Sequence, residues 1–164
     1  MTCAARTVTR STDETLSLAG AVGGLLGPGD VVSLIGDLGA GKTVFARGIA
    51  GALGVTEPVV SPSFTIAREY EGRMPLVHID VYRIDTIQEL HDLGFEELMR
   101  DDGVTLVEWG DAIDALLPSE RLDVRLGAGD GDDERVVEVE GHGPRWQRRA
   151  AELSALGQPI RSST

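Results

Sequence analysis

A glycine-rich segment, residues 36–43, constrains the fold of this chain more than any other feature. It reads Gly-Asp-Leu-Gly-Ala-Gly-Lys-Thr and contains Lys42, the single lysine of the chain, whereas all other basic residues are arginines. The spacing Gly-x4-Gly-Lys-Thr is that of a loop whose backbone N–H groups cradle phosphate oxygens while the lysine ammonium reaches the β- and γ-phosphates. The segment therefore predicts a phosphate-binding loop.

The residues on either side of this loop match the context that such loops require. Residues 31–35 form a short apolar run rich in β-branched side chains, which is typical of a buried strand. After the loop, Phe45, Ile49 and Leu53 recur at helical spacing, and Gly54 follows where a C-terminal cap belongs. A strand, a glycine-rich turn and a helix N-terminus together favour a phosphate site over a simple turn with a solvated lysine.

The size and composition of the chain indicate one globular domain. Its 164 residues are 41% hydrophobic and 26% charged, which is ordinary for such a domain. We predict one phosphate-loop domain at residues 1–156 and a flexible tail at residues 157–164. No apolar run predicts a membrane span, the first residues lack a signal-peptide core, and the lone Cys3 cannot form an internal disulfide, so we expect a cytoplasmic protein.

The strong negative charge limits the partners of the chain. A formal net charge of −12 argues against a free-standing nucleic-acid binder, because phosphate backbones require a basic face. The acidic surface either keeps the protein in solution or faces basic protein partners.

Hydrophobic periodicity in the rest of the chain predicts further strands and helices. We predict an α/β, phosphate-loop NTPase-like fold of three layers, whose mixed sheet is parallel at the nucleotide end and carries antiparallel C-terminal strands. Further strands are expected at residues 7–9, 64–70, 76–83, 104–108, 122–126 and 137–139. Helices are expected from a capping box at residues 11–14 to near residues 27–29, at 86–102 with a break at 94, at 111–117 and at 144–156.

Two carboxylates follow predicted strands where a phosphate loop needs a magnesium ligand. Asp80 and Glu108 each end such a strand, and the Thr43 hydroxyl is the expected ligand from the loop. In one interpretation, one of these acids binds the metal while the other orients water. In the other, either acid is simply a solvated residue at the end of a strand. His78 shares a strand face with Asp80 and either orients it or is a buried structural residue.

Other residues near the predicted site have competing roles. Arg47 and Arg83 either reach phosphate or form surface ion pairs, and Trp109 either covers the site or packs in the core. An Asn-Lys-x-Asp guanine-binding segment is excluded because Lys42 is the only lysine. The loop at residues 127–134 is acidic, which makes it a poor kinase lid over phosphates.

Several sequence blocks together resemble the TsaE family, the small bacterial ATPases required for threonylcarbamoyladenosine modification of tRNA. The resemblance covers about residues 30 to 118, with mild departures at Ser63 and Ile66, and little after Pro118 matches. The matching blocks are Gly-Asp-Leu-Gly-Ala-Gly-Lys-Thr (36–43), Ser-Pro-Ser-Phe-Thr-Ile (61–66), His-Ile-Asp-Val-Tyr-Arg (78–83), Leu-Gly-Phe-Glu-Glu (93–97) and Val-Glu-Trp (107–109).

This resemblance implies a cytoplasmic, Mg²⁺-dependent ATPase that works with TsaB and TsaD, the pair that transfers a threonylcarbamoyl group to tRNA adenosine. The chain would bind ATP, release ADP and reset that pair between rounds, meeting tRNA only indirectly and no membrane. Residues 61–65 would form a switch-like segment that senses the γ-phosphate, or an ordinary turn. The implied nucleotide-binding residues are Asp37, Leu38, Gly39, Ala40, Gly41, Lys42, Thr43 and Trp109, the implied catalytic residues are Lys42, Asp80 and Glu108, and the implied metal ligands are Thr43 and Glu108.

A mechanism follows from these assignments. Lys42 would neutralise developing charge, Thr43 and Glu108 would hold Mg²⁺, and Asp80 would position water. No evident arginine finger lies in the chain, so slow hydrolysis alone and faster turnover with partners are expected. A small-molecule kinase and a regulatory module that binds ATP without turnover remain alternatives.

Overall fold

Seven strands and seven helical segments make up the described part of the chain, which comprises residues 2–37, 39–60, 62, 67–81, 87–92 and 94–157 of the computed structural model. The strands are β1 (Thr2–Thr9), β2 (Val31–Ile35), β3 (Ala67–Glu71), β4 (Pro75–Asp80), β5 (Val104–Glu108), β6 (Arg121–Ala128) and β7 (Arg135–His142). The helices are α1 (Thr12–Gly23), α2 (Lys42–Ala52), α3 (Ile87–Asp92), α4 (Phe95–Leu98), the 3₁₀ segment η1 (Gly110–Leu116), α5 (Pro144–Gln147) and α6 (Ala150–Ala155).

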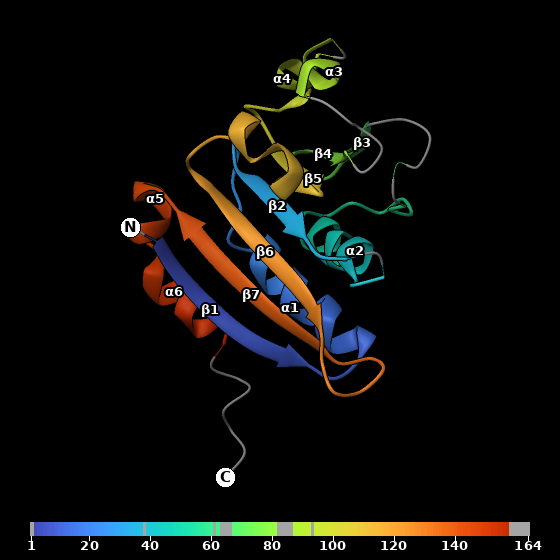
Figure 1. Cartoon of the computed structure of the whole chain (residues 1–164), viewed down its shortest axis with the longest axis vertical. Helices are drawn as coiled ribbons and strands as arrows, with labels where there is room; N and C mark the ends of the chain where they lie inside the picture. The colour runs from blue at the N-terminus through green and yellow to red at the C-terminus, as the bar shows by residue number, and fades with distance from the viewer. Residues whose placement is uncertain are drawn as a thin grey trace.

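The strands form one mixed sheet in the order β1-β7-β6-β2-β5-β4-β3. The phosphate-loop strand β2 lies at its centre and runs parallel to both neighbours, β5 and β6. β4 is parallel to β5, while β3, β7 and β1 pair in the antiparallel sense (Figure 1). The predicted mixed α/β sheet is therefore confirmed, with the difference that the C-terminal strand β6 joins the parallel part.

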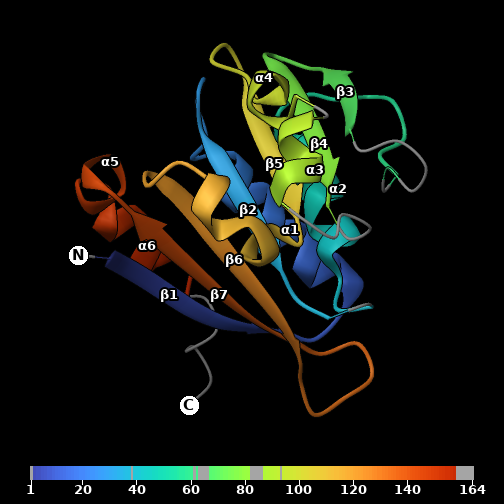
Figure 2. The same cartoon turned by 45° about the horizontal axis from the view of Figure 1, so that its top comes forward.

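Alternate residues along the central strands divide the core between the two faces of the sheet. On β2, Val32 and Leu34 face the cluster that contains α1, α2, Trp146 and Leu153, whereas Val31 faces the cluster that contains helices α3, α4 and η1. Helices thus cover both faces, which gives the expected three layers (Figure 2). No helix among the described residues is long and apolar enough to cross a bilayer.

The N-terminal strand and helix are placed by local signals that the sequence contains. The Ser11 hydroxyl accepts a hydrogen bond from the Glu14 N–H at 3.1 Å, and the Glu14 carboxylate accepts one from the Arg10 N–H at 2.9 Å. This confirms a cap at residues 11–14. β1 is longer than the predicted strand at residues 7–9, because pairing with β7 continues from Thr9 back to Thr2.

Several predicted boundaries were wrong. The first helix ends at Gly23, not near residues 27–29, and the strand predicted at residues 76–83 ends at Asp80. The segment predicted as a helix at residues 111–117 is a 3₁₀ segment with a non-helical Ile113. The helix predicted at residues 144–156 divides into α5 and α6.

The helical division at residue 94 is confirmed, because α3 and α4 lie on either side of Gly94. Parts of other predictions, at residues 64–66, 82–86 and 158–164, lie outside the described residues. The single-domain boundaries remain a prediction.

Candidate nucleotide-binding site

The glycine-rich loop connects the carboxyl end of β2 to the first residue of α2, as the motif predicts. Two of its glycines are required by geometry. A Cβ atom on Gly36 would lie 2.7 Å from the Leu126 carbonyl oxygen, and Gly41, the N-cap of α2, has φ 105°, which disfavours any side chain. The Gly41 carbonyl accepts the first helical hydrogen bond from the Phe45 N–H at 2.9 Å. Leu38 lies outside the described residues.

Lys42 is buried in this loop, with a relative exposure of 5%. Its ammonium group donates hydrogen bonds to the carbonyl oxygens of Gly36 at 2.6 Å and Asp37 at 2.8 Å. The indole ring of Trp109 lies 4.0 Å from the same Nζ atom, measured to the ring centroid, which is a cation–π contact. The loop therefore holds a desolvated positive charge in a fixed position, which favours an anionic ligand there.

The conformation of Trp109 explains how its ring reaches Lys42. Trp109 has φ 64°, the one positive φ of a non-glycine residue among the described residues. Its N–H still donates to the Leu34 carbonyl of β2 at 2.9 Å, so the chain turns sharply where β5 ends. The left-handed conformation of a bulky residue costs free energy, and such strain is concentrated at functional sites. Trp109 thus contacts Lys42 and also packs against the core cluster that contains α3, α4 and η1, so both sequence interpretations describe part of its surroundings.

A hydrogen-bonded chain of side chains links α2 to the two strands beside it. The Thr43 hydroxyl lies 3.4 Å from Oε2 of Glu108, and Nε2 of His78 lies 2.6 Å from that same oxygen. His78 is fully buried and Glu108 is 3% exposed. Because an ionised carboxylate only accepts, the His78 ring donates to it from Nε2. His78 is therefore buried, as the second of the two sequence interpretations expected, and the carboxylate that its Nε2 atom contacts is that of Glu108 and not that of Asp80.

Asp80 lies beside Glu108 at the same edge of the sheet. The parallel register pairs Asp80 with Glu108 and Ile79 with Val107, so both carboxylates leave the ends of adjacent strands on one face. Asp80 is partly exposed, unlike Glu108. The structure thus brings together the residues that the sequence assigned to the site from α2, β4 and β5.

These residues fit a magnesium ion. Mg²⁺ prefers oxygen ligands at about 2.0–2.1 Å in octahedral geometry, which places neighbouring ligand oxygens about 3 Å apart. The Thr43 and Glu108 oxygens are 3.4 Å apart, which is close to that separation. Hydrogen bonding by His78 also fixes the carboxylate, as outer partners of metal ligands commonly do.

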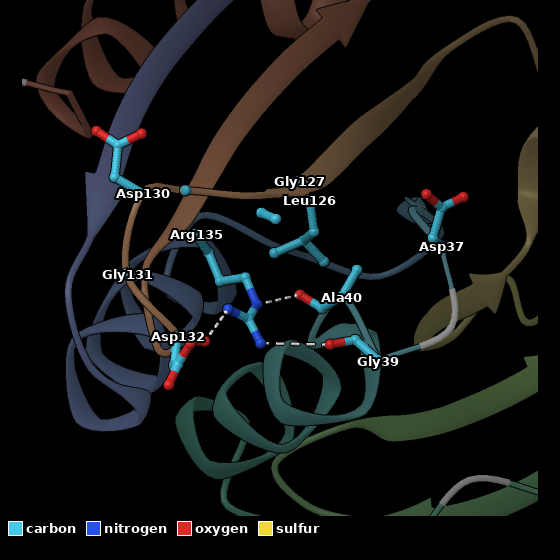
Figure 3. A pocket seen from close by; sticks show the side chains of 11 residues that line it. Asp37, Gly39, Ala40, Leu126, Gly127, Asp130, Gly131, Asp132 and Arg135 are labelled. Carbon is cyan, nitrogen blue, oxygen red and sulfur yellow. Dashed lines mark hydrogen bonds between the residues drawn. The ribbon is translucent and has the colours of Figure 1, made fainter.

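Arg135 is a contact of the loop that sequence reasoning missed. Its Nε atom donates to the Ala40 carbonyl at 2.9 Å and its Nη2 atom to the Gly39 carbonyl at 3.3 Å (Figure 3). Its Nη1 atom donates to the Asp132 and Glu134 carbonyls at 2.9 and 2.8 Å. Arg135 therefore ties the β6–β7 hairpin to the phosphate loop. No motif signals this role, because the contact spans more than 90 residues of chain.

The remaining predicted residues contribute less to the described site. The Nε atom of Arg47 donates to the Val59 carbonyl at 2.9 Å, so this side chain supports the segment that follows α2, and a contact with phosphate stays a prediction. Arg83 and residues 61 and 63–66 lie outside the described residues, so the switch-like segment is not placed.

Comparisons with known proteins agree with this architecture. The family model "Threonylcarbamoyl adenosine biosynthesis protein TsaE" matches residues 9–137. A tRNA threonylcarbamoyladenosine biosynthesis protein TsaE from Bacillus subtilis is 46% identical over 143 residues, which are 87% of this chain and 89% of that protein. The protein of the same name from Treponema pallidum is 40% identical over 121 residues, or 74% and 90% of the two chains.

A solved structure shows the same fold. The crystal structure of YdiB from Bacillus subtilis superposes with a TM-score of 0.79 and is 40% identical, and the match covers 93% of this chain and 95% of that one. Sequence and structure thus agree over nearly the whole chain, and this chain belongs to the TsaE family, whose members take part in the biosynthesis of threonylcarbamoyladenosine in tRNA.

Proposed function

We propose that this chain is a magnesium-dependent ATPase that resets the TsaB–TsaD threonylcarbamoyltransferase between rounds of tRNA modification. The observation that carries the proposal is the arrangement around Lys42. A buried ammonium, the N-terminus of α2, the Thr43 hydroxyl and the Glu108 carboxylate converge at the carboxyl end of the parallel strands. This is where open α/β sheets bind nucleotides.

The residues of the site have distinct tasks in this proposal. Backbone N–H groups of the loop and the helix N-terminus bind the phosphates of ATP, and Lys42 stabilises the charge that develops as the γ-phosphate leaves. Thr43 and Glu108 hold Mg²⁺, which supplies electrostatic neutralisation of the phosphate oxygens. Asp80, adjacent to Glu108 in the register, orients the attacking water.

Slow hydrolysis by the isolated chain is part of the proposal. It is supported by Arg135, whose guanidinium donates to four backbone carbonyls at 2.8–3.3 Å. An arginine supplied by a partner raises the rates of such enzymes by about 10³–10⁵. We therefore propose that the transferase partner stimulates hydrolysis, and that tRNA meets this chain only through that partner.

The test is multi-turnover threonylcarbamoylation of tRNA by TsaB, TsaD and the adenylate-forming enzyme. The reaction is run with the intact chain, with Lys42→Ala and with Gly51→Ala, which alters the same helix at an exposed position away from the site. We expect modification to pass one round per transferase only with the intact chain and Gly51→Ala. Equal product without the chain, or with Lys42→Ala, would contradict the proposal.

A further inference from the structure

Three side chains of types that bind metals converge where β6 and β7 pair, away from the phosphate loop. The Nε2 atom of His142 lies 3.0 Å from Oδ2 of Asp123 and 2.9 Å from Oε1 of Glu140. Asp123 and Glu140 pair in the antiparallel register, on the face of the sheet opposite to α1 and α2, because the neighbouring Leu122 faces that core. His142 is the last residue of β7, whereas Arg135, which contacts the phosphate loop, is the first.

The separations of these three atoms fit a divalent metal ion. Metal–ligand bonds of about 2.0–2.2 Å place neighbouring ligand atoms about 3.0–3.4 Å apart in octahedral or tetrahedral geometry. The distances from the His142 nitrogen to the two carboxylate oxygens lie close to the lower end of that range. A single ring N–H group can be directed at only one of the oxygens at a time, whereas an ion between the three atoms binds all of them.

The burial of the three ligands changes from the interior toward the solvent. The side chain of Asp123 is 4% exposed, that of His142 is 24% exposed and that of Glu140 is 30% exposed. Arg121 donates from Nε to Oδ1 of Asp123 at 2.8 Å, which leaves Oδ2 on the side of His142. Outer partners of this kind fix the orientation of ligating carboxylates. The cluster thus has one oriented, buried ligand and an open side through which an ion can enter.

A buried hydroxyl without a partner lies beside Asp123. Ser33 of β2 is 1% exposed, and its Oγ atom has no hydrogen-bond partner among the described residues. Ser33 pairs with Asp123 in the parallel register, so the two side chains leave the same face of adjacent strands, which are about 4.8 Å apart. Burial of a hydroxyl without a hydrogen bond costs free energy. A water molecule bound to an ion at Asp123 supplies the partner that the hydroxyl lacks.

One positive side chain competes with an ion for the same oxygens. Arg125 lies 3.5 Å from Oε1 of Glu140 through Nη1 and 4.0 Å from Oδ2 of Asp123 through Nη2. These distances are longer than those of good hydrogen bonds, and the side chain of Arg125 is 49% exposed. Arg125 is therefore a weakly held counter-ion, which can turn into the solvent when a metal ion binds.

We propose that Asp123, Glu140 and His142 bind one divalent metal ion of the Zn²⁺ class, which joins β6 to β7. The imidazole ligand favours Zn²⁺ over Mg²⁺, because Mg²⁺ prefers oxygen ligands alone. The site is distinct from the proposed magnesium site at Thr43 and Glu108, which lies at the carboxyl end of the parallel strands. The inference does not depend on the proposed function.

The experiment measures Zn²⁺ binding to the metal-free full chain by calorimetry, in excess Mg²⁺ to occupy the proposed magnesium site. The variants are Glu140→Gln, His142→Gln and Arg125→Gln, and the control is Glu71→Gln, which removes the same charge at an exposed position of the edge strand β3. We expect the intact chain to bind one Zn²⁺ and the first two variants to bind it at least about tenfold more weakly. Arg125→Gln should strengthen binding at least about threefold, because a competing positive charge is removed. The control should change binding by less than about twofold, because exposed charges at a distance are screened.

A second measurement identifies the ligand directly. The chain has three histidines, so nitrogen-15 NMR spectra of the intact chain and of His142→Gln assign the ring signals of His142. Zn²⁺ should shift the Nε2 signal of His142 and leave the signals of buried His78 in place. The inference fails if the intact chain binds no Zn²⁺, if Glu140→Gln and His142→Gln bind it as tightly as the intact chain, or if the His142 signal does not move. The cluster is then an ion-pair network only.

Discussion

Glu108 is the residue on which most contacts of the candidate site converge. It accepts hydrogen bonds from His78 on β4 and Thr43 on α2, and its backbone neighbour Trp109 contacts Lys42. One oxygen, Oε2, takes part in both hydrogen bonds. A change at this carboxylate therefore affects the proposed metal site without removing a side chain from the apolar core.

For this reason, the substitution Glu108→Gln should weaken Mg²⁺ binding without unfolding the protein. The amide keeps the size of the side chain but loses the charge that binds Mg²⁺. We expect the Mg²⁺ concentration for half-maximal ATP hydrolysis to rise at least about tenfold, with a fall in maximal rate of about a hundredfold. Titration of hydrolysis with Mg²⁺ measures both, and Glu138→Gln, at an exposed position of β7, is the control. An unchanged Mg²⁺ dependence would exclude Glu108 as a ligand.

Substitution of His78 tests whether its buried hydrogen bond to Glu108 stabilises the fold. Replacement by phenylalanine keeps an aromatic ring in the core but removes the donor to Glu108, which leaves a buried carboxylate with a weaker partner at 3.4 Å. Loss of a hydrogen bond to a buried charged group costs about 1–3 kcal/mol. Urea unfolding of His78→Phe should show a decrease of that size. The same substitution is then measured in a protein that already carries Glu108→Gln. If His78→Phe no longer lowers the free energy of unfolding there, its effect in the intact protein comes from the contact between His78 and Glu108.

The candidate residues of the site were easier to predict than their contacts. Lys42, Thr43, Asp80 and Glu108 were predicted because their spacing to a strand or a loop is a local property, and their roles stay predictions. The pairing of His78 with Glu108 depends on which strands lie side by side, and the Arg135 contacts depend on a hairpin folding over the loop. Neither arrangement is encoded within a short window of residues.

The two N-terminal helices, α1 and α2, show how closely packed elements position the site. Gly48 of α2 lies against α1, where an added Cβ would be 2.4 Å from the Ala19 Cβ and 2.7 Å from the Leu16 carbonyl oxygen. Gly51, less than one helical turn later, has nothing within 4 Å of an added Cβ. Replacement of glycine by alanine should therefore have opposite effects on the stability of the protein at positions 48 and 51.

Alanine at these two glycines gives a matched pair of stability tests. Gly48→Ala should destabilise the protein by about 1–3 kcal/mol, because the helices must separate to accept the methyl group. Gly51→Ala should stabilise it by about 0.5–1 kcal/mol, because alanine is the better helix former at an exposed site. Chemical denaturation measures both changes. Equal changes in stability for the two variants would mean that α1 and α2 do not approach as closely as described.

Element boundaries differed from the predictions wherever tertiary contacts decide them. The break between α5 and α6 falls at Arg148 and Arg149, where the Arg149 guanidinium donates to the Leu25 carbonyl and to the Glu152 carboxylate. The apolar periodicity of residues 144–156 contains no sign of this break. By contrast, the cap at Ser11 and the strand-loop-helix unit of the phosphate loop were predicted because they rest on local hydrogen bonds and spacing.

At the scale of the whole molecule, the last described helices complete the main core. Trp146 is 1% exposed and belongs, with Leu153, to the cluster that α1 and α2 share. Arg145 also forms an ion pair with buried Asp30 at 2.8 Å. Arg145, Trp146 and Leu153 lie beyond residue 137, where the family match ends, and yet they are integral to this fold.

Trp146→Ala should therefore destabilise the entire fold, not only its C-terminal end. Truncation of a buried aromatic side chain costs about 3–5 kcal/mol. We expect the thermal unfolding of the variant to remain a single transition at a lower temperature, and Arg148→Ala, which changes an exposed neighbour, to leave that temperature nearly unchanged. A separate early transition, with the main transition unaffected, would show that α5 and α6 fold as an independent unit.

The pairing of β1 with β7 has a consequence for how the protein is made. Thr2 pairs with His142 and Thr9 with Arg135, so the strand β1 has its partner only after residues 135–142 have been synthesised. The Arg135 contacts that hold the phosphate loop form at the same late stage. Contacts between distant parts of a chain slow folding. A nascent chain on the ribosome consequently carries the complete phosphate-binding motif well before it has a finished nucleotide site.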